Sequence, residues 1–470
     1  MSVINTNVSS LIAQRALNQN QKALNTSLER LSTGLKINSG ADDPAGLIAS
    51  QNLQAEQAGI NAAIGNAQKA NNILGTAEGG LNEVSSLLTQ LQGLVSQSAN
   101  TGGLSSDEIA ANQLQVDSIL STINRIAQST SFEGTKLLDG NFDYTTSSVG
   151  TSAIGGLQVN SASVPDGGKV NVVVQVVNSA QTAELQYSGG TVTGSTVTLE
   201  IAGNLGTTQL SFASGTTVSS IVTAVNAVTN TTGVSASVTG AGSFKVDSTQ
   251  YGSAQYVGLK AISGTFALAS NKATGRDATV TINGSAAETA GLHVNYDSAS
   301  LNLDFDVSTS ANFNSASKTF AITGGGATFA LGAKVDEGDK ASIGIASVST
   351  GSLGSSALGF LNSLGSGGAN SLNSGNLVAA QNILTQAVQQ VSNLRGRIGA
   401  FQDYTIGSTV NSLSVAYENV SSAESDITDT DFAQETSNLT RDQILTQAAQ
   451  TVLSQANSRP SAVLNLLQNA

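Results

Sequence analysis

Apolar side chains recur with helical spacing at both ends of this 470-residue chain. In residues 4–35, steps of three, four or seven residues separate them, with one irregular step between Leu11 and Leu17. This spacing predicts a helix with a narrow apolar stripe, which needs partner helices to be buried. The stripe positions that we expect to pack in an assembly are Ile4, Val8, Leu11, Leu24, Leu28, Leu31 and Leu35.

The clearest periodicity runs through residues 45–100, where apolar residues recur every seven positions without an intervening proline. Such a repeat predicts one long helix with a coiled-coil seam, about 84 Å long at 1.5 Å per residue. A glycine turn at 101–103 then reverses the chain into an antiparallel helix. Ser105 and Glu108 have the spacing of a capping box at its start. The seam positions that we single out in the long helix are Ile60, Leu74, Leu81 and Leu88.

The helical pattern returns at Asn376 and continues to the end of the chain. Steps of four and three residues alternate up to Thr405, and the pattern resumes at Ile406 after a slip of one residue. The predicted seam positions before the slip are Leu384, Val391, Leu394 and Ile398. In the last segment, the expected assembly positions are Leu445, Ala449, Val452, Ala456, Val463 and Leu466.

Between residues 141 and 370 the chain is rich in Ser, Thr, Gly and Val, and alternating runs such as 169–177, 196–201 and 301–305 predict strands. Residues 219–228 interrupt them with a short helical pattern. The fold class is therefore α + β and multidomain: a helical coiled-coil rod, discontinuous in sequence, with an inserted β-rich region. The predicted segments are 1–40 (terminal helix), 41–140 (rod), 141–370 (one or two β-rich domains), 371–428 (rod) and 429–470 (terminal helix).

The stretch from Arg30 to Leu47 joins the first two helical segments through a polar turn. We expect Leu31 and Leu35 to end the first helix and Asn38-Ser39-Gly40 to break it, since Asn and Gly tolerate left-handed backbone. Asp42 or Asp43 can cap the next helix, with Pro44 in its first turn.

Composition leaves little material for chemistry. Only 11% of residues are charged, the net charge is −13, and the chain has one His and no Cys. The acidic balance argues against a nucleic-acid partner, and the missing residue types exclude disulfides, thiolate sites and two-histidine metal sites. The acidic residues between Glu424 and Glu435 lack the spacing of a calcium loop and fit a solvated linker. We expect no catalytic residue, no metal and no cofactor.

No apolar run approaches the roughly 18 residues of a membrane span, so we expect no membrane insertion. The N-terminus lacks a basic stretch followed by an apolar block, so we expect no cleavable signal peptide. A cytoplasmic protein and one exported by a machine that reads an uncleaved N-terminus both satisfy this observation.

Several motifs closely resemble bacterial flagellins. They are Arg30–Leu47, Leu94–Asn100, Phe132–Gly140, Asp431–Leu439 and Gln443–Ala448, and they cover both ends of the chain. Residues 217–238, within the insert, resemble a β-rich module found inside some flagellins. The specificity of the end motifs makes the resemblance strong over roughly the first 140 and last 95 residues.

The resemblance implies an extracellular, self-assembling subunit of the flagellar filament. Such subunits leave the cell through the flagellar type III export apparatus, with a chaperone, and assemble under a filament cap beyond hook-junction proteins. It also implies a weak contact with an innate immune receptor, since the family's Arg, Leu and Glu contacts align with Gln90, Leu94 and Gln115. Loss of both charges predicts weaker recognition, because charged hydrogen bonds are stronger than neutral ones.

The sequence is also compatible with three further functions. A hook–filament junction protein has similar ends, but the large insert and the Arg30–Leu47 match favour a filament subunit. A cell-surface adhesin would usually carry an anchor or signal peptide. An enzyme is the least favoured, because the chain has a single His, no Cys and no convergent acid pair.

Overall fold

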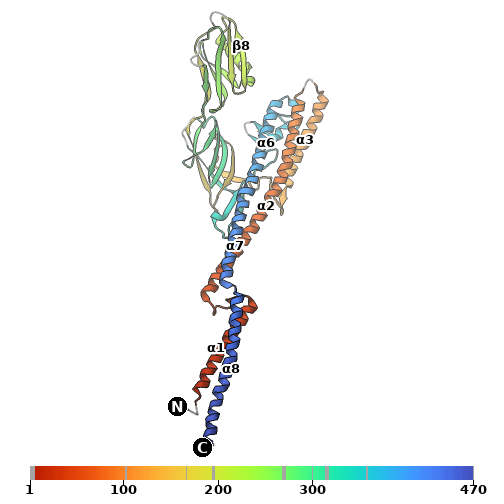
Figure 1. Cartoon of the computed structure of the whole chain (residues 1–470). Coiled ribbons are helices and arrows are strands. Elements are labelled where there is room, and N and C mark those ends of the chain that lie inside the picture. The colour runs from red at the N-terminus through yellow and green to blue at the C-terminus, as the bar shows by residue number, and fades with distance from the viewer. Residues whose placement is uncertain are drawn as a thin grey trace. The chain divides into compact units, whose positions relative to one another are not determined.

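The computed structural model describes residues 6–100, 103–165, 167–192, 196–266, 271–298, 300–312, 317–355 and 358–468. The chain forms two compact units, each built from segments far apart in the sequence, as the colours of Figure 1 show. The terminal unit comprises Met1–Gln68, Ala330–Asp339 and Gly407–Ala470. The central unit comprises Lys69–Phe329 and Lys340–Ile406.

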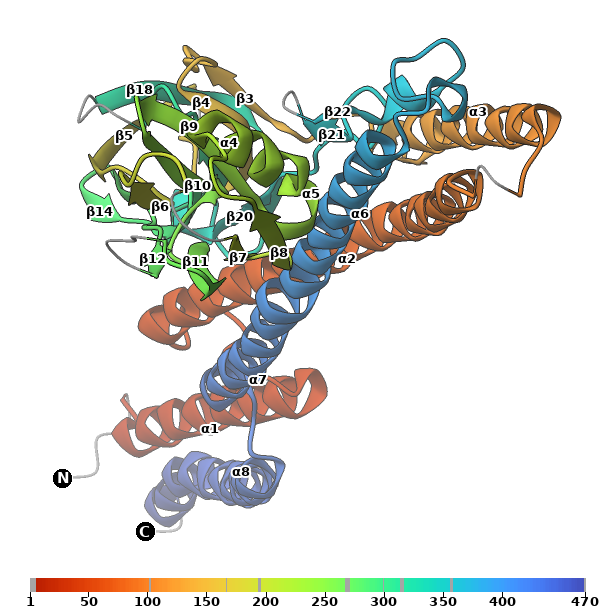
Figure 2. The ribbon, with the colours of Figure 1, turned by 90° about the horizontal axis from the view of Figure 1, so that it is seen from above.

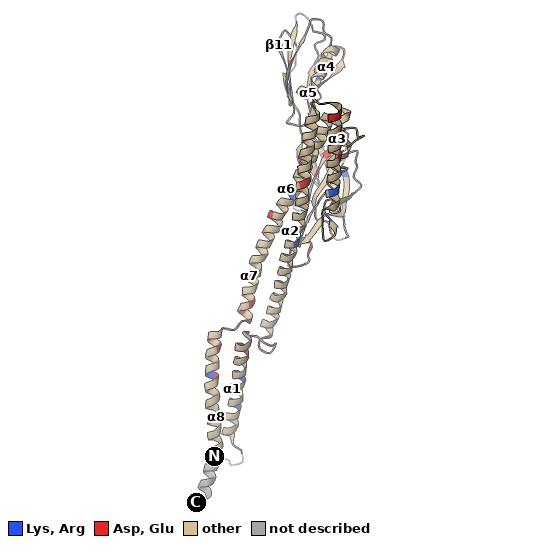
Figure 3. Ribbon diagram, turned by 90° about the vertical axis from the view of Figure 1, so that its right-hand side faces the viewer, with Lys and Arg blue, Asp and Glu red and all other residues tan. Residues whose placement is uncertain are grey.

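The terminal unit is helical. Its outermost helices, α1 (Val8–Thr33) and α8 (Phe432–Gln468), lie side by side and antiparallel (Figures 1 and 3). The unit also holds the start of α2 (Pro44–Ser98), α7 (Ser408–Thr428) and the 3-10 turn η1 (Glu337–Asp339). Helix α2 has 55 residues, which confirms the predicted long helix.

The helical part of the central unit consists of the rest of α2 with α3 (Ser106–Ser129) and α6 (Leu377–Ala400), seen together in Figure 2. The predicted capping box is confirmed, because Ser105 Oγ accepts from Glu108 N and the Glu108 carboxylate accepts from Ser105 N at 2.7 Å. The predicted turn after α3 is the hairpin β1 (Ser131–Phe132)–β2 (Thr135–Lys136). Its two turn residues have positive φ, 48° at Glu133 and 83° at Gly134.

A π-helical turn, η4 (Phe401–Gly407), accommodates the one-residue slip in the C-terminal pattern. A π turn holds one residue more than an α turn, so the apolar stripe keeps facing the same side across the extra residue. Contacts within the central unit hold its start. Gln402 Nε2 donates to Asn71 Oδ1 at 2.8 Å, and the rings of Phe401 and Phe329 lie 6.1 Å apart.

Deletion of Thr405 is expected to be tolerated. The shortened segment can continue as a regular α-helix with its apolar residues still in phase, so we expect unchanged helical circular dichroism and a change in unfolding free energy of about 1 kcal/mol or less. Deletion of the exposed Gln389, within α6, is the matched control. It turns the following stripe by about 100° and should destabilise the protein strongly. Equal effects of the two deletions would contradict this explanation.

The insert begins with a two-sheet sandwich. A five-stranded sheet has the order β14-β13-β5-β18-β3 and a four-stranded sheet the order β15-β16-β17-β4. Both sheets contribute to one core, which includes Phe305 and Phe320. The strands are β3 (Tyr144–Ser147), β4 (Ile154–Ala162), β5 (Val170–Asn178), β13 (Thr279–Ile282), β14 (Ser285–Ala286), β15 (Glu288–Ala290), β16 (His293–Ser298), β17 (Leu301–Val307) and β18 (Ser317–Gly325).

A second β module interrupts the sandwich between β5 and β13. Its sheets have the orders β6-β10-β9 and β12-β11-β7-β8, and helix α4 (Val218–Ala227) confirms the short helix predicted there. Its core includes Phe244 and the stacked rings of Tyr187 and Phe266, 4.0 Å apart. The remaining elements are β6 (Thr182–Tyr187), β7 (Val197–Gly203), β8 (Gly206–Phe212), α5 (Thr229–Thr232), β9 (Val234–Gly240), β10 (Ser243–Tyr251), β11 (Tyr256–Ser263) and β12 (Lys272–Thr274).

Short elements lead back to the helices. They are β19 (Ala327–Ala330), β20 (Lys340–Ile343), β21 (Gly354–Ser355), β22 (Gly359–Phe360), η2 (Leu361–Leu364) and η3 (Leu372–Ser374). Side-chain hydrogen bonds from Gln113, Asp117 and Asn124 join this stretch to α3. Gln113 Oε1 accepts from Leu372 N at 2.7 Å, and Asp117 Oδ1 accepts from Ser366 N at 2.8 Å.

Candidate assembly surfaces

The seam between α1 and α8 consists mainly of small and polar residues. Ser10, Ala13 and Ser27 are the buried residues of α1. Half-buried residues continue the same three-and-four spacing, so that the seam of α1 is Ser10, Ala13, Leu17, Asn20, Leu24, Ser27 and Leu31. The matching positions of α8 are Glu435, Asp442, Thr446, Ala449, Leu453 and Ala456.

The predicted assembly residues fall into two groups within the chain, and their packing in an assembly stays a prediction. Ala449 and Ala456 are buried, and Leu24 and Leu31 are half-buried on the seam. The larger group points away from it and is exposed: Val8 (59%), Leu11 (57%), Leu28 (47%), Leu35 (38%), Leu445 (43%) and Val452 (58%). Ile4 and the side chains of Val463 and Leu466 lie outside the part of the chain that the structure describes.

The structure adds three exposed apolar side chains that sequence reasoning missed: Ile12, Phe432 and Ile444. Ile12 and Ile444 each stand next to a predicted residue, so a single stripe leaves them out. Charged side chains are sparse along both helices (Figure 3). The outer faces of α1 and α8 thus carry exposed large apolar groups, as expected of surfaces that another helix covers.

The turn after α1 differs from the prediction at its start. Gly34, with φ of 77°, ends the helix, because its N–H donates to Arg30 O from a left-handed position. Leu35 is therefore outside the helix and pairs with Asp429 in an isolated antiparallel bridge. Asn38-Ser39-Gly40 lies within the following loop and does not break the helix.

The start of α2 has the predicted aspartate cap and first-turn proline, and the structure shows which of the two aspartates is the cap. Asp43 Oδ1 accepts from Ala45 N at 3.1 Å and from Gly46 N at 2.9 Å, so Asp43 is the cap, and Pro44 opens the helix. Asp42 instead accepts from Ser39 N at 2.8 Å and tightens the loop. That hydrogen bond lowers the pKa of the Asp42 carboxyl.

In the part of α1 and α8 whose side chains the structure describes, together with the cap residue Asn7, four polar contacts connect the two helices. Two amides donate to main-chain carbonyls, one hydroxyl donates to an amide, and one ion pair closes the end near the turn. They are Asn7 Nδ2 to Ala456 O (2.7 Å), Ser10 Oγ to Asn457 Oδ1 (2.6 Å), Asn20 Nδ2 to Leu445 O (3.1 Å) and Arg30 Nη1 to Glu435 Oε2 (3.9 Å).

The eight residues singled out on the rod seam are all buried: Ile60, Leu74, Leu81, Leu88, Leu384, Val391, Leu394 and Ile398. An ion pair on the helix surface joins α6 to α2, with Arg395 Nε 2.8 Å from Glu78 Oε1. The nearby Arg397 Nη2 donates to Gly344 O at 3.3 Å. Burial lowers the pKa of the Arg397 guanidinium.

The three receptor-equivalent residues lie on α2 and α3. Gln90 and Gln115 are exposed, and Leu94 is half-buried. The Gln90 and Gln115 side chains are thus accessible to solvent, and each ends in a neutral amide.

The single histidine, His293, lies beside a carboxylate and not in a cluster of possible metal ligands. Over the described ranges, no three His, Asp or Glu side chains come together as a metal site. His293 Nδ1 lies 2.9 Å from Asp306 Oδ1, and this hydrogen bond raises the pKa of the imidazole.

Among the described helices, none is long and apolar enough to cross a membrane.

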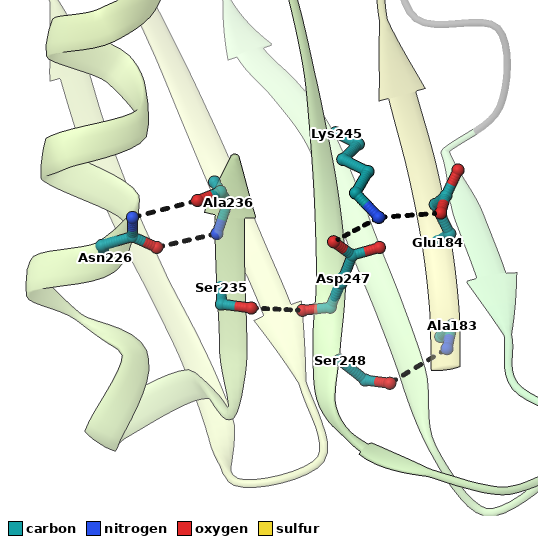
Figure 4. Close-up of polar contacts among 8 residues, drawn as sticks. All are labelled: Ala183, Glu184, Asn226, Ser235, Ala236, Lys245, Asp247 and Ser248. Carbon is teal, nitrogen blue, oxygen red and sulfur yellow. Dashed lines mark hydrogen bonds and ion pairs between the residues drawn. The ribbon is translucent and has the colours of Figure 1, made fainter. Parts of the chain in front are cut away.

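The second β module contains a compact charged group on its sheet β6-β10-β9 (Figure 4). Lys245 Nζ lies 3.2 Å from both Glu184 Oε2 and Asp247 Oδ2, between two carboxylates on directly paired strand positions. Burial raises the pKa of the Asp247 carboxyl. At the opposite edge of the same sheet, Asn226 of α4 hydrogen-bonds both main-chain groups of Ala236, which fixes α4 to β9 (Figure 4).

Substitution of Lys245 by Met is expected to destabilise this module most at neutral pH. Without the ammonium group, two like charges face each other across the strands, a cost of at most about 1 kcal/mol. Because the native pKa of Asp247 is above its unfolded value, the ionised carboxylate opposes folding at pH 7, and protonation removes that cost as the pH falls through the native pKa. Denaturant unfolding of the unmodified protein and of Lys245→Met, at pH 7 and pH 4, measures the loss of unfolding free energy at each pH. A larger loss at pH 4 than at pH 7 would contradict this account.

Comparison with known families gives three matches. Residues 4–143 match the model of the bacterial flagellin N-terminal helical region, and residues 381–467 match that of the C-terminal helical region. Residues 198–250, within the second β module, match the flagellin hook IN motif.

Full-length relatives are similar over the whole chain. Flagellin D of Vibrio anguillarum is 30% identical over 99% of this chain and 99% of its own, and Flagellin A of Vibrio cholerae is 29% identical with the same coverage. Among solved structures, FliC from Burkholderia pseudomallei is 17% identical, with a TM-score of 0.24 over 71% of this chain and 99% of that one.

Proposed function

Because this chain belongs to the bacterial flagellin family, we propose that the outer faces of α1 and α8 are the surfaces through which its copies polymerise. As a flagellin, the protein is a structural subunit of the extracellular flagellar filament and not an enzyme. The match to flagellins along the entire chain does not favour a hook–filament junction protein or a cell-surface adhesin.

One observation carries the proposal. Nine large apolar side chains of α1, α8 and the turn between α1 and α2 are exposed: Val8, Leu11, Ile12, Leu28, Leu35, Phe432, Ile444, Leu445 and Val452. Burying even half of them against neighbouring subunits contributes on the order of 10 kcal/mol, at about 2 kcal/mol for each side chain. Such a contribution is sufficient to drive association of helices that cannot bury these faces alone.

The same reasoning extends to the domain layout. We propose that 1–40 and 429–470 form the inner layer, 41–140 and 371–428 the rod, and 141–370 the outward insert. The inner-layer positions include Ile4, Val463 and Leu466. We further propose that the subunit passes through the export apparatus with a chaperone and is added under a cap beyond hook-junction proteins. The absence of cysteine suits passage of an unfolded chain.

Recognition by the innate immune receptor is expected to be weak. Gln90 and Gln115 cannot form the charged hydrogen bonds of the family's Arg and Glu, each of which is roughly twice as strong as a neutral one. Reporter cells should respond less to this protein than to its double variant Gln90→Arg/Gln115→Glu. A full response to the unmodified protein would contradict the proposed contact residues.

Electron microscopy of the purified protein, incubated at increasing concentration, tests the assembly proposal. Filaments are expected from the unmodified chain. A variant with Leu11, Ile444 and Val452 replaced by Ser should remain monomeric with unchanged thermal unfolding of the central unit. Equal polymerisation of this variant would show that the outer faces are not the assembly surfaces.

A further inference from the structure

We infer that polar contacts, and not apolar packing, set the register in which α1 and α8 of one subunit pair. The inference rests on the proposed assembly function and deepens it, because register decides which apolar side chains stand next to each other on the outer faces. It concerns the four polar contacts between the two helices: Asn7–Ala456, Ser10–Asn457, Asn20–Leu445 and Arg30–Glu435.

The seam itself discriminates weakly between registers. Its buried residues are Ser10, Ala13 and Ser27 in α1, and in α8 they are Glu435, Asp442, Thr446, Ala449 and Ala456. Small side chains bury little apolar surface, and the half-buried leucines of α1, Leu17, Leu24 and Leu31, recur every seven residues. A slip by one heptad therefore sets leucine where leucine stood over most of α1, at little cost in apolar burial. Apolar packing alone therefore leaves neighbouring registers close in energy.

The polar contacts do distinguish registers. A slip of one heptad moves each partner by roughly 10 Å, well beyond hydrogen-bond distance. The Asn7 and Asn20 amides would lose the carbonyls of Ala456 and Leu445. This is the role that isolated polar residues take in coiled coils, where they specify register at some cost in stability.

The ion pair has the largest consequence. The Glu435 side chain is only 8% exposed, so a shifted register would leave its carboxylate buried opposite α1 without Arg30. Removing one partner of a buried charge pair is strongly destabilising, because the other charge stays uncompensated. The Arg30 Nε atom is also buried and has no hydrogen-bond partner in the described chain, so the guanidinium depends on Glu435 for compensation at the seam.

The turn next to α1 holds the same register from outside the helices. Thr430 N donates to Gly34 O at 2.9 Å and Lys36 N donates to Thr428 O at 2.6 Å, around the Leu35–Asp429 bridge. The polar contacts extend this alignment from residue 30 back to residue 7, about 35 Å along α1. Backbone pairing at the turn and side-chain pairing along the helices therefore specify one alignment.

Disulfide trapping measures the register directly, because the chain has no cysteine of its own. The full-length variant Ser10→Cys/Asn457→Cys reports the observed register, since these side chains touch. The variant Ser10→Cys/Gln450→Cys reports a slip of one heptad. Filaments formed from each, after mild oxidation, should show the first cross-link in at least about tenfold excess, given the cost of an unpaired buried charge.

Charge substitutions far from the cross-link then test its cause. Arg30→Glu should lower the excess about tenfold or block polymerisation, and the swap Arg30→Glu/Glu435→Arg should restore the unmodified behaviour. Lys22→Glu, on the exposed side of α1, is the control with the same change in charge and should have no effect. The inference is overturned if Arg30→Glu leaves the ratio of the two cross-links unchanged, or if the swap does not restore the ratio or the polymerisation that Arg30→Glu loses. Failure of the unmodified chain to polymerise would instead contradict the proposed function.

Discussion

Deletion of residues 441–470 is expected to abolish filament formation while the central unit stays folded. The deletion removes three of the exposed apolar side chains, Ile444, Leu445 and Val452, and the α8 half of the seam from Asp442 onward. It removes no residue of the central unit, which ends at Ile406. Sedimentation and electron microscopy measure polymerisation, and thermal circular dichroism follows the folded part.

A second deletion provides the control. Replacing residues 182–275 by a short glycine linker removes the second β module, whose entry and exit strands lie together where Gln181 bridges Arg276. This variant should still polymerise, because the terminal unit is intact. Filaments from the first deletion, or none from the second, would contradict the assignment of assembly to α1 and α8.

Substitution of Leu81 by Ala is expected to lower the free energy of unfolding of the central unit by about 2–5 kcal/mol. Leu81 is fully buried on the seam of α2, so the change removes apolar contacts and leaves a cavity. Calorimetry of the monomer should show a lower melting temperature, by about 1–2 °C for each kcal/mol in a folded unit of this size.

Leu114→Ala on α3 is the matched control, since Leu114 is 70% exposed. It should change the unfolding free energy by no more than about 0.5 kcal/mol. A similar loss in both variants would show that the predicted seam is not the core of the rod.

Features that depend on neighbours in the sequence could be predicted from the sequence. The seven-residue repeat predicts α2 and its seam, because each turn of a helix repeats the geometry of the last. Ser105 with Glu108, and Asp43 with Pro44, predict helix starts through hydrogen bonds that reach only three residues. The family followed from motifs at both ends, which are local patterns as well.

Other features depended on contacts between distant residues. Gly34 and Gly40 are equally able to end α1, and the bridge from Leu35 to Asp429, nearly 400 residues away, accompanies the choice of Gly34. The slip near Ile406 is visible in sequence, but its form as a π turn depends on packing within the central unit. The pairing order of the insert strands, such as β18 between β5 and β3, likewise joins segments more than 100 residues apart.

The largest difference between the sequence prediction and the structure concerns α1 and α8. The sequence by itself determined that both helices carry apolar residues at helical spacing. It could not determine which side of each helix faces the other, since the apolar residues cover more than one side. The tertiary structure placed Ala, Ser and polar residues on the shared seam, where small side chains let the helices approach and polar groups find partners. The large side chains were thereby left exposed on the outer faces.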